Sequence, residues 1–219
     1  MLKYPCLVLD HDDTVVKSEV TVNYPCFLKA LEKFRPGESM AYQEFVSWCF
    51  RCEFTDFLRI RYGFTEDELL EEYHMWQEYS KSHIPPAYDG IREIILEQKR
   101  RGGLVCVASL STRENILRDY RTHIGIEPDM IFSCNDPRDQ RKPGIYPLNA
   151  IMARYSLSPS ELLMVDDLKT GYDMASAAGV PIAFAAWSRL ENPEVMAQME
   201  GLCDFSFHST EEFRDFLFK

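Results

Sequence analysis

Five short apolar runs recur along the chain, and each is followed by turn residues and then by a helical pattern of apolar positions. The runs are CLVLD at 6–10, LVCVAS at 104–109, MIFSC at 130–134, ELLMVDD at 161–167 and PIAFAAW at 181–187. Runs that are apolar at successive positions favour strands buried on both faces, as in a parallel sheet covered by helices. The alternation of strands and helices predicts an α/β fold with a doubly wound, Rossmann-like parallel sheet as its core.

Helix starts are marked between these runs by capping boxes, in which a Ser or Thr is followed three residues later by Glu. The pattern occurs at Ser111–Glu114, Ser158–Glu161 and Ser209–Glu212. We therefore expect a helix to begin after each of these serines.

The segment between Val16 and Pro86 has a different pattern. It lacks a convincing buried strand, yet about 70 residues are too many for a structureless loop in a compact domain. Its apolar and aromatic positions follow helical spacing over residues 23–34, 41–54 and 65–79, the last after a capping box at Thr65–Glu68. We therefore expect a helical cap domain over residues 16–86, inserted into an α/β core domain made of residues 1–15 and 87–219.

Composition narrows the range of partners. The chain is 46 % hydrophobic and 27 % charged, as in ordinary globular proteins, and its apolar runs are too short for a membrane span. A net charge of −11 disfavours nucleic acid, which binds basic surfaces. An anionic small molecule stays compatible with this charge if local cations or a metal offset it.

The N-terminal residues lack a signal-peptide layout, so we expect a cytoplasmic protein. The seven cysteines are an odd number, and in a reducing compartment we expect them to be free thiols.

Polar residues gather where the predicted strands end. Since the carboxyl ends of parallel strands meet in one crevice, these residues should lie together. They comprise four carboxylates, a hydroxyl and an ammonium: Asp10, Asp12, Asp166, Asp167, Ser109 and Lys142. Oxygen ligands of this kind suit Mg²⁺, and the metal and the lysine would supply the positive charge that the acidic cluster lacks.

The order and spacing of these residues resemble the haloacid dehalogenase-like hydrolase superfamily. Its DxDxT motif appears as Asp10-His11-Asp12-Asp13-Thr14, and its second motif as LVCVAS with Ser109. The third motif appears as Lys142-Pro143 and the fourth as LLMVDD at 162–167. The resemblance covers essentially the whole chain, and the helical insertion is similar to the C1-type cap of this superfamily.

The resemblance implies a role for each matching residue. Asp10 would be the nucleophile that forms an aspartyl-phosphate, and Asp12 would protonate the leaving alcohol and then activate water. Mg²⁺ would bind Asp10, the backbone carbonyl of Asp12 and Asp167, with Asp166 direct or through water. Ser109 and Lys142 would hold the transferring phosphoryl oxygens. The intact DxD indicates phosphate ester chemistry, because the dehalogenases have a different residue in place of Asp12.

The sequence departs from the superfamily pattern at three places. Asp13 stands where relatives often have Gly, so that a side chain must fit a tight turn. Lys17 replaces a common acid at the base of the cap, where it is a candidate substrate contact. Sugar-phosphate mutases carry a histidine at the start of the cap, whereas Val22 or Asn23 occupies that region here. Arg51 is a further candidate substrate contact within the cap.

These observations predict a Mg²⁺-dependent phosphatase that acts on a small phosphorylated metabolite through an aspartyl-phosphate. A phosphomutase of the beta-phosphoglucomutase type stays open as an alternative with the same chemistry. A catalytically silent metabolite-binding or interaction module on the same fold stays open as well, because a fold does not determine a function.

Overall fold

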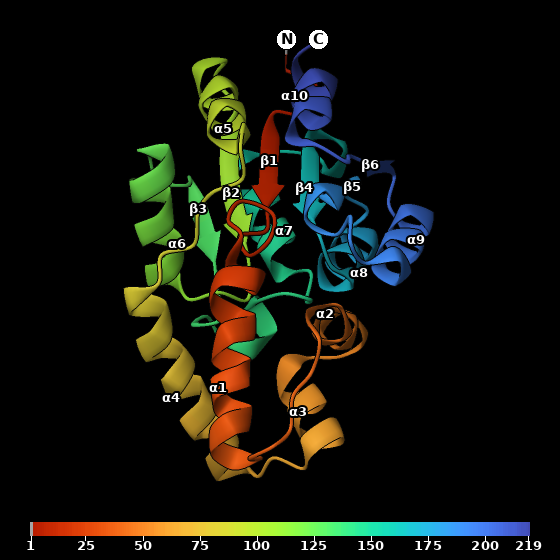
Figure 1. Ribbon diagram of the computed structural model, residues 1–219. Helices are drawn as coiled ribbons and strands as arrows, with labels where there is room; N and C mark the ends of the chain where they lie inside the picture. Colours follow the sequence, from red (N-terminus) through yellow and green to blue (C-terminus); the bar gives the residue numbers. More distant parts are fainter. Residues whose placement is uncertain (1) are drawn as a thin grey trace. The chain divides into compact units, whose positions relative to one another are not determined.

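The computed structural model of the protein describes residues 2–219, which form two compact units. One unit contains the chain up to Lys17 and from Pro86 to Lys219, and it holds the sheet. The other unit, Ser18–Pro85, is helical. Figure 1 labels the elements of both units. Within residues 2–219, no helix has both the length and the apolar character that a membrane span requires.

The sheet confirms the predicted α/β class. Its strands, as far as the chain is described, are β1 (Cys6–Leu9), β2 (Leu104–Ala108), β3 (Met130–Phe132), β4 (Leu162–Asp166), β5 (Ile182–Phe184) and β6 (Phe205–Ser206). All pairs are parallel, in the order β3-β2-β1-β4-β5-β6, and β1 lies between β2 and β4 (Figure 1). The chain passes from β1 to β2 and β3 on one side and then crosses to β4 on the other side of β1. The strand order reverses at this point, so a ligand crevice is expected at the carboxyl ends of β1 and β4.

Apolar layers cover both faces of the sheet, because successive side chains of a strand point to opposite faces. Leu7 and Leu9 of β1 belong to one layer, and Cys6 and Val8 belong to the other. The first layer includes residues of α5 (Ile91–Arg100), α6 (Arg113–Asp119) and α10 (Thr210–Phe218). The second includes residues of α7 (Tyr146–Tyr155) and α8 (Lys169–Ala178). Burial on both faces explains why the strands read as continuous apolar runs.

Short helical turns complete the sheet unit together with α9 (Pro193–Leu202). They are η2 (Tyr120–Ile124), η3 (Arg138–Gln140), η4 (Pro159–Glu161) and η5 (Ala186–Ser188).

The predicted capping boxes had mixed outcomes. Ser209 caps α10 by accepting a hydrogen bond from the Glu212 N–H, as expected. Ser158 and Glu161 form the reciprocal box, but around the short turn η4 rather than a full helix, because β4 begins at the next residue. The prediction at Ser111 was wrong by one residue, since Thr112 caps α6.

The helical unit contains the turn η1 (Glu19–Asn23), α1 (Tyr24–Phe34), α2 (Tyr42–Arg51), α3 (Phe54–Tyr62) and α4 (Glu66–Ser82). The capping box at the start of α4 is present as predicted. The helix expected over 41–54 corresponds to α2 but ends at Arg51, because Cys52 takes an extended conformation, and α3 was not predicted. Phe27, Phe45 and Phe57 are fully buried and pack together at ring-centroid distances of 4.9 to 6.1 Å. This aromatic core accounts for the many Phe and Tyr residues of the segment.

Candidate active site

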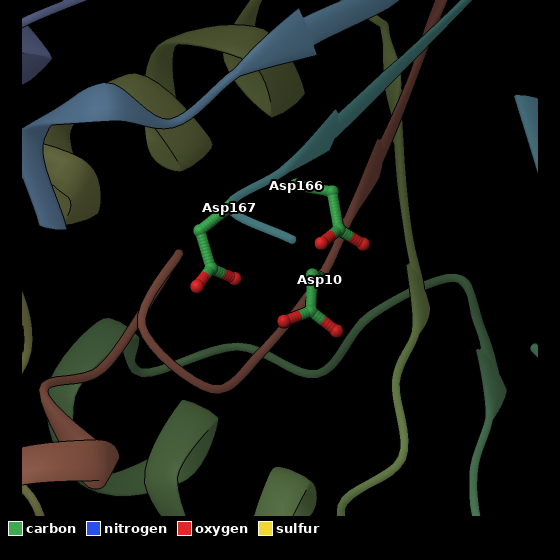
Figure 2. A group of neighbouring side chains, drawn as sticks. All are labelled: Asp10, Asp166 and Asp167. Atoms are coloured by element: carbon green, nitrogen blue, oxygen red, sulfur yellow. The ribbon is translucent and has the colours of Figure 1, made fainter. Parts of the chain in front are cut away.

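Three buried carboxylates meet where β1 and β4 end. The Asp10 N–H donates to the Val165 carbonyl at 2.9 Å, which extends the pairing of the two strands by one residue. Asp166 is the last residue of β4, and Asp167 follows it. Each of the three offers a carboxylate oxygen within 4.8 Å of the others, and all three are buried (Figure 2). The sheet topology thus brings together acids that are more than 150 residues apart in the sequence.

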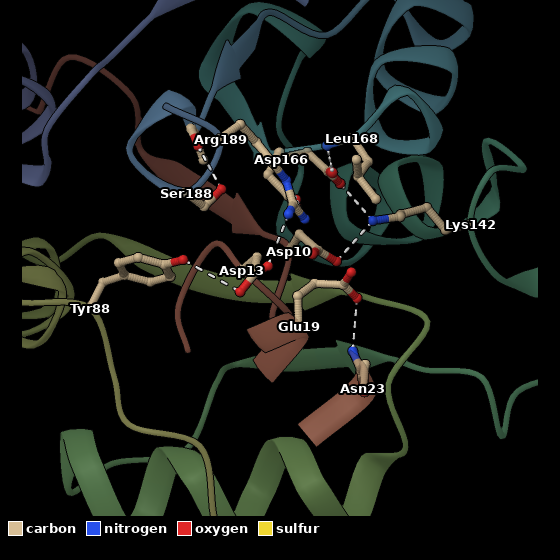
Figure 3. Close-up of polar contacts among 12 residues, drawn as sticks. Asp10, Asp13, Glu19, Asn23, Tyr88, Lys142, Asp166, Leu168, Ser188 and Arg189 are labelled. Atoms are coloured by element: carbon tan, nitrogen blue, oxygen red, sulfur yellow. Dashed lines mark hydrogen bonds and ion pairs between the residues drawn. The ribbon is translucent and has the colours of Figure 1, made fainter. Parts of the chain in front are cut away.

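Lys142 supplies one buried positive charge to this cluster. Its Nζ donates to Oδ1 of Asp10 at 2.8 Å and to Oδ2 of Asp166 at 2.6 Å (Figure 3). Burial alone would lower the pKa of Lys142, but the attraction of the two carboxylates outweighs it and raises that pKa. The ammonium is therefore held in its charged form.

The cluster nevertheless has a surplus of negative charge. Burial raises the pKa of Asp10 well above its usual range; Lys142 acts in the opposite direction, and Asp166, Asp167 and Asp12 raise the pKa further. Burial also raises the pKa of Asp167. Additional positive charge at this place would favour the ionised carboxylates.

The hydrogen bonds determine which carboxylate oxygens can accept a further ligand. Asp166 uses both of its oxygens, one for Lys142 and the other for the Leu168 N–H at 2.9 Å. Among residues 2–219, no hydrogen-bond donor contacts Oδ2 of Asp10 or Oδ1 of Asp167. These two oxygens are the best placed to bind a cation directly.

Gly171 provides the space that the Asp166 carboxylate occupies. A Cβ atom at Gly171 would overlap the carboxylate group of Asp166. This close approach explains a glycine in the first turns of α8, where glycine is a poor helix former.

Ser109 follows β2 directly and is buried. Its N–H donates to the Phe132 carbonyl at 3.0 Å, and its hydroxyl oxygen accepts a hydrogen bond from the Ser111 N–H at 3.2 Å. The Ser111 N–H occupies one acceptor site of the Ser109 hydroxyl oxygen. The hydroxyl proton is not used by this bond, so it can donate to an anion.

The loop after β1 is a tight turn. The N–H groups of Val15 and Val16 donate to the His11 carbonyl, and the Asp13 N–H donates to the Val16 carbonyl at 2.7 Å. Asp13 has a φ of 52°, in the left-handed region that glycine reaches more easily. Asp12 in this loop is partly buried, and it lies near enough to Asp10 for its negative charge to raise the pKa of Asp10.

Sequence analysis missed Arg189, which is buried beside the acidic cluster after η5. Its Nε donates to Oδ2 of Asp167 at 2.7 Å, and its Nη1 lies 3.1 Å from Oδ2 of Asp13. Arg189 is two residues beyond the apolar run PIAFAAW. A cationic residue so close to the end of a predicted parallel strand is the sequence signal that points to it.

The two candidate substrate contacts lie in different units. Lys17 is partly buried in the sheet unit, and its Nζ lies 5.3 Å from the centre of the Tyr88 ring. Arg51 is exposed at the end of α2 in the helical unit. Their contact with a substrate stays a prediction.

Comparison with known proteins agrees with this geometry. Residues 7–185 match the family described as haloacid dehalogenase-like hydrolase. Curated proteins gave no match.

Solved structures with the same fold cover nearly the whole chain. A predicted phosphoglycolate phosphatase from Haemophilus somnus 129pt is 16 % identical with a TM-score of 0.76, over 99 % of both chains. CbbY from Rhodobacter sphaeroides, in complex with xylulose-(1,5)bisphosphate, is 15 % identical with a TM-score of 0.71, over 96 % of this chain and 95 % of that chain. A protein described as a candidate beta-phosphoglucomutase from Bacteroides vulgatus is 18 % identical with a TM-score of 0.71, over 97 % and 87 %. From the family match and the shared fold, we conclude that the chain belongs to the haloacid dehalogenase-like hydrolase family.

Proposed function

We propose that the protein is a Mg²⁺-dependent phosphatase that hydrolyses a phosphate monoester of a small metabolite through an aspartyl-phosphate at Asp10. The observation that carries this proposal is the buried cluster of Asp10, Asp166 and Asp167, with Lys142 bonded to two of its members. Burial of several carboxylates together costs free energy, which a bound cation would offset. Buried acids with shifted pKa values are typical of functional sites.

The donor set fits Mg²⁺, since every available ligand atom is an oxygen and the cluster needs positive charge. Asp10 and Asp167 would bind the ion through the oxygens that no other donor contacts, together with the backbone carbonyl of Asp12. Asp166, whose oxygens both accept hydrogen bonds, would act through water. When bound, the ion would polarise the phosphoryl group and offset its charge.

Four side chains of the site would carry out the remaining chemistry. The Asp10 carboxylate would attack phosphorus and form the covalent intermediate, while the leaving oxygen takes a proton from Asp12. Asp12 would then accept a proton from the water that cleaves the intermediate. The Asp12 side chain is only partly buried, so water can reach it. Lys142 and the Ser109 hydroxyl would stabilise the charge on the phosphoryl oxygens.

Two observations on the helical unit support a phosphatase over a phosphomutase. The position of the mutase histidine falls at Val22, which is buried, or at Asn23. The Asn23 amide donates to Glu19 (Figure 3) and accepts a hydrogen bond from Trp76, each at 2.9 Å. Neither residue can replace an imidazole in proton transfer to a second sugar hydroxyl.

We propose further that the unit Ser18–Pro85 serves as the cap domain and that Lys17 and Arg51 contact the substrate. The complex of CbbY with a sugar bisphosphate supports a small phosphorylated substrate. The cysteines, all free thiols, support a cytoplasmic location.

The test is release of inorganic phosphate from a panel of sugar, nucleotide and glycerol phosphates and an aryl phosphate. The wild type is compared with Asp10→Asn, with Mg²⁺ and with EDTA. The matched control is Asp173→Asn, whose carboxylate is half exposed and paired with Lys169. Metal-dependent release that is lost only in Asp10→Asn is expected. Absence of release from every compound would overturn the phosphatase, and a bisphosphate-dependent transfer would establish the mutase.

A further inference from the structure

Asp13 and Arg189 form a buried ion pair next to the candidate metal ligand Asp167. The side chains of all three are at most 2 % exposed. Nη1 of Arg189 contacts Asp13, while Nε and Nη2 both contact the same oxygen of Asp167, Oδ2 (Figure 3 draws the contact with Asp13). The guanidinium therefore bridges the turn after β1 and the end of β4.

The bridge is fixed at both of its ends. The Arg189 N–H donates to the Ala186 carbonyl at 2.9 Å, and the Arg189 carbonyl accepts from the Asn192 N–H at 2.8 Å. At the other end, the Tyr88 hydroxyl donates to Oδ1 of Asp13 at 3.4 Å. The planar guanidinium offers donors in a fixed arrangement, so a rigid backbone on each side transmits its orientation to Asp167.

From this geometry we infer that Arg189, held by Asp13, is a positioning residue that orients Asp167 for the metal. Arg189 contacts Oδ2 of Asp167, which would leave Oδ1 for the ion. Asp13 serves as the anchor of Arg189, which gives a physical reason for a carboxylate at a left-handed position where glycine is easier to accommodate. The inference deepens the proposed function and depends on its metal site.

Charge and orientation predict opposite effects when Arg189 is removed. Loss of a cation leaves the site more negative, and charge alone would then strengthen Mg²⁺ binding. Loss of orientation weakens binding, and partners that orient metal ligands are typically worth 10- to 100-fold in affinity. The sign of the change therefore separates the two explanations.

The test is calorimetric titration of the purified protein with Mg²⁺ alone, together with thermal melting in EDTA. We expect Arg189→Gln to weaken Mg²⁺ binding about 10-fold or more. The double variant Asp13→Gly with Arg189→Gln keeps the total charge of the site and should show a similar loss. Arg189→Lys keeps the charge but has one nitrogen in place of the fork, so it should recover binding only in part.

Each outcome has a defined meaning. Tighter or unchanged Mg²⁺ binding by Arg189→Gln, or by the double variant, would overturn the inference. A lower melting temperature in EDTA with unchanged affinity would reduce Arg189 to a structural role and overturn it as well. If Arg189→Gln does not fold, the affinity of Arg189→Lys decides, with wild-type affinity counting against the inference. Absence of Mg²⁺ binding by the wild type would instead count against the proposed function itself.

Discussion

The Lys142 ammonium lies 2.8 Å from Oδ1 of Asp10, and both side chains are at most 6 % exposed. The same ammonium lies 2.6 Å from Asp166, so that one buried cation serves two buried carboxylates. This contact connects the loop after β3 with the ends of β1 and β4.

Removal of Lys142 should therefore destabilise the protein as well as inactivate it. In Lys142→Gln, Asp10 and Asp166 lose their cation, and breaking a buried pair in this way typically costs about 3–5 kcal/mol. Urea unfolding at neutral pH in EDTA measures the change. Lys169→Gln is the matched control, because Lys169 pairs with Asp173 at the surface and such pairs contribute about 1 kcal/mol or less. Equal stability of the two variants would contradict the importance of the buried pair.

Gly171→Ala should damage the site through Asp166. The added methyl group overlaps the Asp166 carboxylate, and overpacking of this kind costs about 1–3 kcal/mol. Displacement of the Asp166 carboxylate would weaken its contact with Lys142, so we expect phosphatase activity to fall as well. Gly201→Ala in α9 is the control, since nothing lies within 4 Å of its Cβ position and alanine favours the helix. Both variants are compared by thermal melting and phosphate release, and an active, stable Gly171→Ala would contradict the steric argument.

Asp12→Ala should separate catalysis from metal binding. The side chain of Asp12 is proposed to move protons, whereas its backbone carbonyl would contact the ion. We expect phosphate release to fall by about 10²- to 10⁴-fold, while the shift in melting temperature on addition of Mg²⁺ is retained. A variant that loses the Mg²⁺ shift would show that the side chain of Asp12 is needed for the metal instead.

Glu72 should make the stability of the helical unit depend on pH. Burial raises its pKa to about 7 from an ordinary value of 4.5. The folded state therefore favours the protonated acid, so this stabilisation is complete below pH 4.5 and is lost as the pH rises through about 7. Above that pH, Glu72→Gln should be more stable than the wild type by about 3 kcal/mol, with little difference in acid. Glu71→Gln, an exposed neighbour, is the control in urea unfolding across the pH range, and parallel curves for Glu72→Gln and the wild type would contradict the prediction.

The sequence was sufficient to predict the sheet because its strands are buried on both faces and therefore apolar at every position. The strand β6 was missed, since Phe205 and Ser206 are too few to form a pattern. The end of α2 at Arg51 was missed because Cys52 and Glu53 change neither the pattern of charged residues nor the spacing of aromatic residues in the segment.

The acids of the site could be predicted because parallel strands place their carboxyl ends together, so Asp10, Asp166 and Asp167 had to be neighbours. Arg189 could not be assigned a partner from sequence. Its contact with Asp13 depends on the left-handed turn at that residue and on the place of β5 next to β4, and neither is visible as a local pattern.

Asp10 is proposed to carry the phosphoryl group during turnover. The most direct measurement is a single-turnover reaction with the best substrate of the panel, quenched in acid and analysed by peptide mass spectrometry. We expect a transient phosphoryl group on the peptide that contains Asp10, and none in Asp10→Asn. Phosphate release without that intermediate, or wild-type release by Asp10→Asn, would contradict it.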